Sequence, residues 1–172
     1  MNSGSEHENS TLSGWDLWLA EHGAALLLYA RQQVRSPGDA EDLLQEAVVE
    51  TWQQQADRSP PPLWQVYATL RRRAIDLARR NERRARRELA SADGSEAAWF
   101  DPAPEDRERA HLIEEALRCL PHMHQEVLTL KVWGGLTLAE IGQVLGIPAN
   151  TAASRYRSAL MDLRKLTREL LV

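Results

Sequence analysis

The 172-residue chain has a single cysteine, Cys119, so it can form no intrachain disulfide. A reducing compartment is the simplest setting for such a chain, and we expect it in the cytoplasm. The first residues are polar and do not resemble a signal peptide, and the longest apolar run, residues 24–30, is too short to cross a bilayer. No membrane insertion is therefore expected.

Motifs for catalysis and cofactor binding are also missing. The chain has no Ser/His/Asp set, no Gly-rich phosphate loop and no nucleotide signature, so we expect neither an enzyme nor a small-molecule substrate nor a cofactor. Cys119, His122 and His124 lie close together, but a structural zinc site needs four ligands. His111 adds a fourth only if the intervening helix folds back, and we expect no metal site.

Charge is distributed unevenly along the chain. The net charge of −4 does not suggest a nucleic-acid partner, but residues 1–56 hold nine acids and two arginines, whereas residues 71–87 hold nine arginines and two acids. A basic side chain that neutralises a phosphate releases counterions close by, so binding to a polyanion depends on local rather than net charge. The basic segment therefore indicates a polyanionic partner. A solvated helix face is the alternative, yet so many arginines would repel one another without a polyanion.

Hydrophobic periodicity predicts an all-α fold, because no two-residue period is convincing anywhere. We expect two small helical domains joined by a flexible acidic linker, the second domain carrying a helix-turn-helix. The expected organisation is a disordered tail at 1–11, a first domain at 12–89, a linker at 90–104 and a second domain at 105–172. Within the first domain, helices are expected over 12–34, 39–55 (with Asp39 as N-cap) and 63–87.

The most informative stretch is residues 136–165, which read as two helices and a tight turn, the geometry that sets one helix into a DNA major groove. Thr137 and Glu140 predict a capping box at the first helix. Gly146 suits its left-handed end, and Pro148 prevents continuation, so the second helix starts at Asn150 or Thr151. The alternative is a helical hairpin that only packs. The second helix offers as nucleic-acid contacts Thr151, Ser154, Arg155, Arg157 and Ser158.

Two separated segments resemble one family. Residues 39–52, DAEDLLQEAVVETW, resemble the second conserved region of bacterial RNA polymerase sigma factors, and residues 120–165 resemble the fourth. The short chain, with only a linker between these regions, is similar to the extracytoplasmic-function group. The resemblance implies a sigma factor that binds core RNA polymerase and directs initiation at promoters with −10 and −35 elements. It also implies an anti-sigma factor as a further partner.

The resemblance implies three sets of site residues. Those implied to bind the clamp helices of the polymerase largest subunit are Asp42, Gln45 and Glu46. Those implied to contact −10 DNA are Arg71, Arg72, Arg73, Arg79, Arg80 and Arg83. Those implied to contact −35 DNA are Thr151, Ser154, Arg155, Arg157 and Ser158, with Ser154 and Arg157 as base-edge candidates and Arg155 as a phosphate anchor.

The chain departs from the family pattern at two places. Arg72 replaces an asparagine found in many relatives, and Ala153 replaces a cationic residue that often faces DNA. Trp64 and Tyr67 fit either the core, which their helical spacing favours, or an aromatic surface beside single-stranded DNA.

Two other functions fit parts of the pattern. An autonomous helix-turn-helix regulator would form a dimer on a palindromic site. A sigma-like antagonist would bind polymerase without selecting promoters. The oligomeric state, measured as the mass in solution, distinguishes the dimeric regulator from a sigma factor. Promoter-dependent transcription with added polymerase distinguishes the antagonist from a sigma factor.

Overall fold

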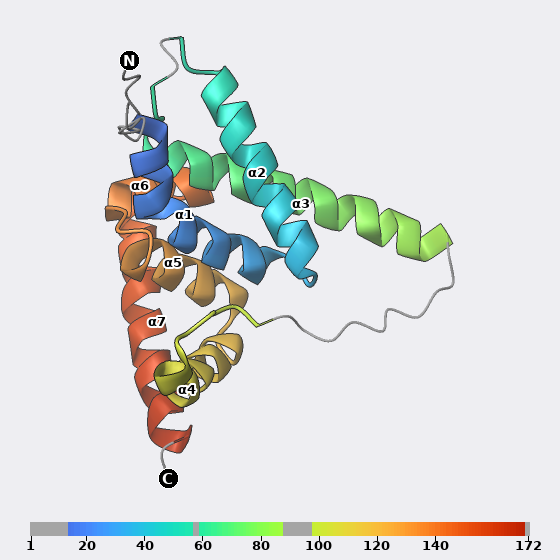
Figure 1. Ribbon diagram of the computed structural model, residues 1–172. Helices are drawn as coiled ribbons and strands as arrows, with labels where there is room; N and C mark the ends of the chain where they lie inside the picture. Colours follow the sequence, from blue (N-terminus) through green and yellow to red (C-terminus); the bar gives the residue numbers. More distant parts are fainter. Residues whose placement is uncertain (1–13, 57–58, 88–97, 171–172) are drawn as a thin grey trace, which may run out of the picture.

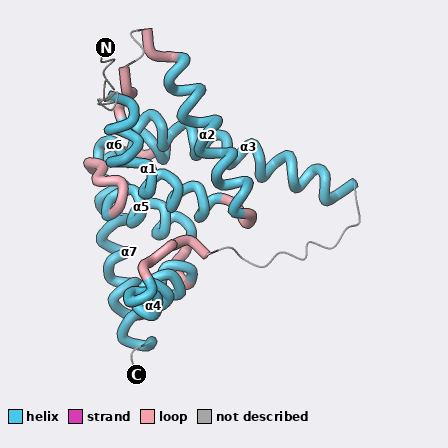
Figure 2. Tube along the Cα trace, viewed as in Figure 1, coloured by secondary structure: helices cyan, strands magenta, loops and turns pink. Residues whose placement is uncertain are grey.

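The computed structural model describes residues 14–56, 59–87 and 98–170, and these residues form helices and loops without a strand (Figure 2). The all-α prediction is thus confirmed. The predicted tail at 1–11 and residues 90–97 of the predicted linker lie outside the described residues. The helices are α1 (Gly14–Gln33), α2 (Pro37–Gln53), α3 (Leu63–Arg87), a 3₁₀ turn η1 (Pro104–Asp106), α4 (Arg107–Arg118), α5 (His122–Val132), α6 (Leu138–Leu145) and α7 (Ala149–Leu170).

Helices α1, α2 and α3 pack on one another and form the N-terminal unit. Their contact seams are the apolar positions that recur at helical spacing, such as Leu43 and Ala47 on α2 and Val66 and Leu70 on α3, all of which are buried. The basic C-terminal half of α3 extends beyond the other helices (Figure 1). That half lacks a continuous apolar stripe, so nothing requires it to be covered.

Helix α2 begins earlier than predicted. Its N-cap is Ser36 rather than Asp39, and the Ser36 hydroxyl accepts a hydrogen bond from the backbone N–H of Asp39 at 3.4 Å. Pro37 occupies the first helical position, where its missing N–H is not needed and its fixed φ suits the helix.

The helix-turn-helix forms as the sequence predicted. Thr137 accepts from the N–H of Glu140 at 3.2 Å, and the Glu140 carboxylate accepts from the N–H of Thr137 at 2.8 Å, which completes the capping box. Gly146 ends α6 with a left-handed φ of 68°. Helix α7 starts at Ala149, directly after Pro148 and slightly before the predicted start. The two helices therefore stand in the expected order and turn geometry.

Helices α4, α5 and α6 pack on α7 and form the C-terminal unit. The two units share one hydrophobic core, since α3 packs on α6 and α1 packs on α5. The end of the predicted linker takes part in this core, because Trp99 is only 7% exposed. Glu114 accepts a hydrogen bond from the N–H of Trp99 at 3.1 Å, and the Arg118 guanidinium lies 4.2 Å from the centroid of the indole ring. Trp99, which lies within the predicted linker, is thus packed against α4.

Candidate polymerase and nucleic-acid interfaces

The outer face of α2 carries the three residues predicted to bind polymerase. Asp42, Gln45 and Glu46 are all exposed, on the side of the helix away from the buried Leu43 and Ala47. A partner helix can reach this face, and its carboxylates and amide offer hydrogen-bond acceptors to basic side chains.

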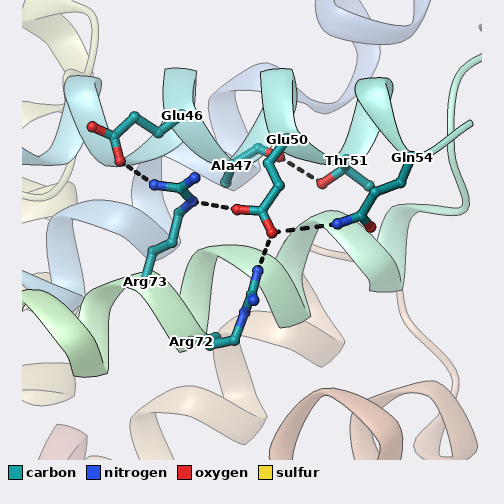
Figure 3. Close-up of polar contacts among 7 residues, drawn as sticks. All are labelled: Glu46, Ala47, Glu50, Thr51, Gln54, Arg72 and Arg73. Carbon is teal, nitrogen blue, oxygen red and sulfur yellow. Dashed lines mark hydrogen bonds and ion pairs between the residues drawn. The ribbon is translucent and has the colours of Figure 1, made fainter.

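Glu50, which sequence reasoning did not select, joins α2 to the start of the basic segment of α3 (Figure 3). Its carboxylate accepts from the guanidinium of Arg72 and from Nε of Arg73, the latter at 2.7 Å. Arg73 also forms an ion pair with Glu46, so a predicted polymerase residue and a predicted DNA residue contact each other. The hydrogen bond from Arg72, supported by Arg73, lowers the pKa of Glu50. Glu50 and these two arginines are 22 and 23 positions apart on different helices, so no pattern along one helix could have indicated the contact.

The exposed end of α3 presents the remaining basic residues predicted to bind −10 DNA. Arg79, Arg80 and Arg83 are exposed, and Arg79 lies 3.9 Å from Asp76 of the preceding turn. A groove separates this helix from α2, with acidic side chains on the α2 wall and both arginines and Asp76 on the α3 wall. The charged residues that line it are Asp39, Asp42, Glu46, Glu50, Arg72, Arg73, Asp76 and Arg80.

The structure corrects the repulsion argument for the arginine segment. Arg72 and Arg73 are neutralised by acids of α2, and Arg71 by Glu126 of α5. Mutual repulsion therefore does not require a polyanion for these three arginines. The electrostatic evidence for a nucleic-acid partner therefore comes from the exposed arginines at the end of α3.

Arg71 lies apart from the other arginines predicted to bind −10 DNA, in contact with the C-terminal unit. Its Nε donates to Oε1 of Glu126 at 2.9 Å, and the hydroxyl of Tyr29 donates to the same oxygen at 2.8 Å. Burial raises the pKa of Tyr29, and the charge of Glu126 raises it further, so the phenol stays protonated and acts as a donor.

The N-terminal half of α7 forms the surface predicted to read −35 DNA. Ala152 and Ala159 are buried, whereas Ser154 and Arg157 are exposed on the opposite side. The Ser154 hydroxyl donates to the carbonyl of Thr151 at 2.9 Å. The other predicted contacts are half-buried at the edges of this surface: Thr151, Arg155 and Ser158. Helix α7 runs along the edge of the molecule opposite to the free end of α3 (Figure 1).

Tyr67 belongs to the core rather than to a surface beside single-stranded DNA, because it is completely buried and its ring meets that of Tyr29 edge to face. The candidate metal ligands have other contacts, since His124 Nδ1 lies 2.9 Å from Asp162 and His122 lies 3.6 Å from Glu126. Within the described ranges, no three His, Cys, Asp or Glu side chains group as a metal site would require. None of the described helices is both long and apolar enough to span a membrane.

Comparisons with known proteins match both units. Residues 18–84 match the family model of sigma-70 region 2, and residues 116–165 match that of sigma-70 region 4. The chain is 31% identical over 156 residues to the ECF RNA polymerase sigma factor SigL of Mycobacterium tuberculosis, which covers 87% of this chain and 86% of SigL. It is 33% identical over 143 residues to the RNA polymerase sigma-E factor of Streptomyces avermitilis, covering 82% and 78% of the two chains.

A solved structure shares the fold. The sigma factor RpoE of Bartonella quintana, determined in complex with the anti-sigma factor NepR, superimposes with a TM-score of 0.72 at 20% identity. The superposition covers 90% of this chain and 96% of RpoE. The matches to regions 2 and 4 and the 31% identity to SigL show that the chain belongs to the extracytoplasmic-function group of sigma-70 family RNA polymerase sigma factors, which direct promoter-specific initiation of transcription.

Proposed function

We propose that the outer face of α2, formed by Asp42, Gln45 and Glu46, is the surface that binds the clamp helices of core polymerase. The observation that supports this is the exposure of all three side chains on the side away from the packing seam. Complementary charge speeds encounter and fixes the orientation of a helical partner.

We propose that −10 DNA binds along the exposed end of α3 and that −35 DNA binds on α7. Arg79, Arg80 and Arg83 neutralise phosphates and stack on unpaired bases, while Ser154 and Arg157 reach base edges in the major groove. The two surfaces lie at opposite edges of the molecule, so polymerase sets the spacing in which both can act together.

A charge-reversal experiment tests the assignment of the polymerase surface. D42K/E46K should lower the affinity for core polymerase roughly tenfold or more, because it places like charges against a basic partner. Glu46 also pairs with Arg73, so D42K alone is needed to separate docking from loss of that ion pair. E105K/E115K, at two exposed acids of the C-terminal unit, is the control with the same change in charge.

Affinity for core polymerase is measured by fluorescence anisotropy, with far-UV circular dichroism to confirm helicity. Unchanged affinity in both D42K and D42K/E46K would exclude this face as the docking surface. Promoter-dependent transcription with added core then tests the activity directly, and its loss in the same variants is expected.

We also propose a cytoplasmic location and no catalysis by the chain itself, because polymerase performs the chemistry that a sigma factor directs. The solved relative was captured with an anti-sigma factor, which supports a regulator of the same kind for this chain.

A further inference from the structure

We propose that Glu50 is a positioning residue for promoter specificity, which holds the Arg72 guanidinium in the orientation in which that side chain reads a guanine of the −10 element. Because −10 DNA is proposed to bind α3, this role rests on the proposed function. It adds to that function a residue of α2 that acts on DNA through another side chain.

Glu50 is held in place by several polar neighbours (Figure 3). Its Oε2 accepts from Nε of Arg73 at 2.7 Å, and Arg73 also pairs with Glu46. Its Oε1 accepts from Nε2 of Gln54 at 3.3 Å and from Nη2 of Arg72. The Glu50 side chain is only 21% exposed. A carboxylate with both oxygens engaged in a satisfied network is rigid, so it offers Arg72 a fixed acceptor.

Arg72 is held at one nitrogen and keeps its other donors. Its side chain is 58% exposed, and among the described residues its polar partner is Glu50 alone. Nε, Nη1 and the second hydrogen of Nη2 remain, which leaves one two-donor edge of the guanidinium complete. Guanine presents two acceptors, O6 and N7, on one edge, and arginine commonly donates to both. A guanidinium that is already fixed loses less conformational freedom when it makes this contact.

Arg72 lies on the face of α3 that −10 DNA is proposed to follow. Arg79 and Arg83 come seven and eleven positions later, close to two and three helical turns, so the three side chains share one face of the helix. Arg72 also lines the groove between α2 and α3 together with Arg80. DNA that contacts the exposed end of α3 can therefore extend to Arg72.

The ion pair with Glu50 determines which kind of contact Arg72 makes. Because the carboxylate balances its charge, Arg72 contributes little to the counterion release that gives sequence-independent affinity. Its remaining N–H groups can still donate, and hydrogen bonds to base edges are what distinguish one sequence from another. The exposed arginines at the end of α3 thus supply affinity, and Arg72 supplies selectivity.

A template pool randomised at the −10 and −35 positions tests this role, with holoenzyme made from the full chain and core polymerase. Sequencing the transcribed templates gives the base preference at every position, and the −35 positions are an internal control. E50Q keeps the size of the side chain and removes its charge, whereas E50D keeps the charge and shortens the reach. R72A removes the side chain that touches DNA, and E41Q, at an exposed acid of α2, is the matched control for lost charge.

The parent and E41Q should prefer guanine at one −10 position. We expect E50Q, E50D and R72A to lower this preference about fivefold or more and to leave the −35 preferences unchanged. E50Q should also bind DNA of any sequence more tightly and with a steeper salt dependence, because Arg72 is no longer neutralised. Loss of an ion pair that only stabilises the fold would not tighten binding. E50Q/R72A should select no worse than R72A, since Glu50 acts through Arg72.

A parent without the guanine preference, or an unchanged preference in the folded Glu50 variants, would overturn the proposal. Equal losses at −10 and −35, or a further loss in E50Q/R72A, would do the same. Circular dichroism shows whether each variant is folded, and E50D carries the test if E50Q is not.

The proposed −10 surface is tested separately by R79A/R80A. This variant should flatten the slope of log K against log salt concentration by roughly 1.4–1.8, because two phosphate contacts are lost. If it does so while the Glu50 variants keep the parent's base preference, the −10 surface stands and the role of Glu50 is refuted.

Discussion

Tyr29 and Tyr67 provide a direct comparison of the same change at adjacent positions. Both side chains are completely buried, and their rings meet edge to face with centroids 5.3 Å apart. Their hydroxyl groups differ, because that of Tyr29 donates to Glu126 at 2.8 Å, whereas that of Tyr67 has no hydrogen-bond partner among the described residues. Replacing each tyrosine with phenylalanine removes one oxygen and leaves the ring.

The expected energies have opposite signs. Y29F removes a hydrogen bond to a charged acceptor, which contributes about 1.5–3 kcal/mol to the free energy of unfolding. Glu126 keeps Arg71, so the loss should lie near the lower end of this range. Y67F removes a buried hydroxyl that is desolvated without compensation, a penalty of about 1–3 kcal/mol, so the variant should be as stable as the parent or more stable.

Urea unfolding followed by far-UV circular dichroism measures both variants, and each serves as the volume-matched control for the other. We expect the midpoint of Y29F to fall and that of Y67F to stay or rise, at an unchanged slope. An equal loss in both variants would refute the reasoning, since it would mean that the hydroxyl groups have equivalent environments. An unchanged midpoint for Y29F would show that its bond to Glu126 contributes nothing to stability.

Three further predictions concern the helix-turn-helix. T137A should lower the free energy of unfolding by about 1 kcal/mol in thermal or urea unfolding, because it removes the N-cap. The hydrogen bonds of Thr137 hold the pKa of Glu140 below 4.5, so the contribution of Glu140 to stability should be complete above pH 4.5 and lost as the pH falls further. T137A should reduce this dependence of stability on pH. G142A should lower the free energy of unfolding by about 1–3 kcal/mol, because the added Cβ would lie 2.6 Å from the carbonyl oxygen of Ile147. Helix propensity alone predicts that alanine raises the stability, so a more stable G142A variant would refute the close contact. R157A should lose about 1–3 kcal/mol of discrimination at one base pair of the −35 element in competition assays with the holoenzyme, and equal loss on all sequences would indicate a phosphate contact instead.

Much of the candidate site follows from local sequence. The capping box of Thr137 and Glu140, the left-handed Gly146 and the exposed faces of α2 and α7 depend on residues three or four positions apart. Helical periodicity and capping preferences act over the same short range, so they can be read without a tertiary structure. The error at the start of α2, where Asp39 was predicted as N-cap, arose because Ser36 followed by Pro37 is the stronger start.

The tertiary structure decided how the charged residues pair. Arg71 and Glu126 are 55 positions apart, and the arginine segment by itself gave no reason to separate Arg71 from its neighbours. The same holds for Glu50 between Arg72 and Arg73. Sequence by itself determined the fold class, the helix-turn-helix and the two exposed helix faces. Only the packing of the helices on one another decided which arginines are paired with acids, because an ion pair depends on distance in space, and helices distant in sequence supply its partners.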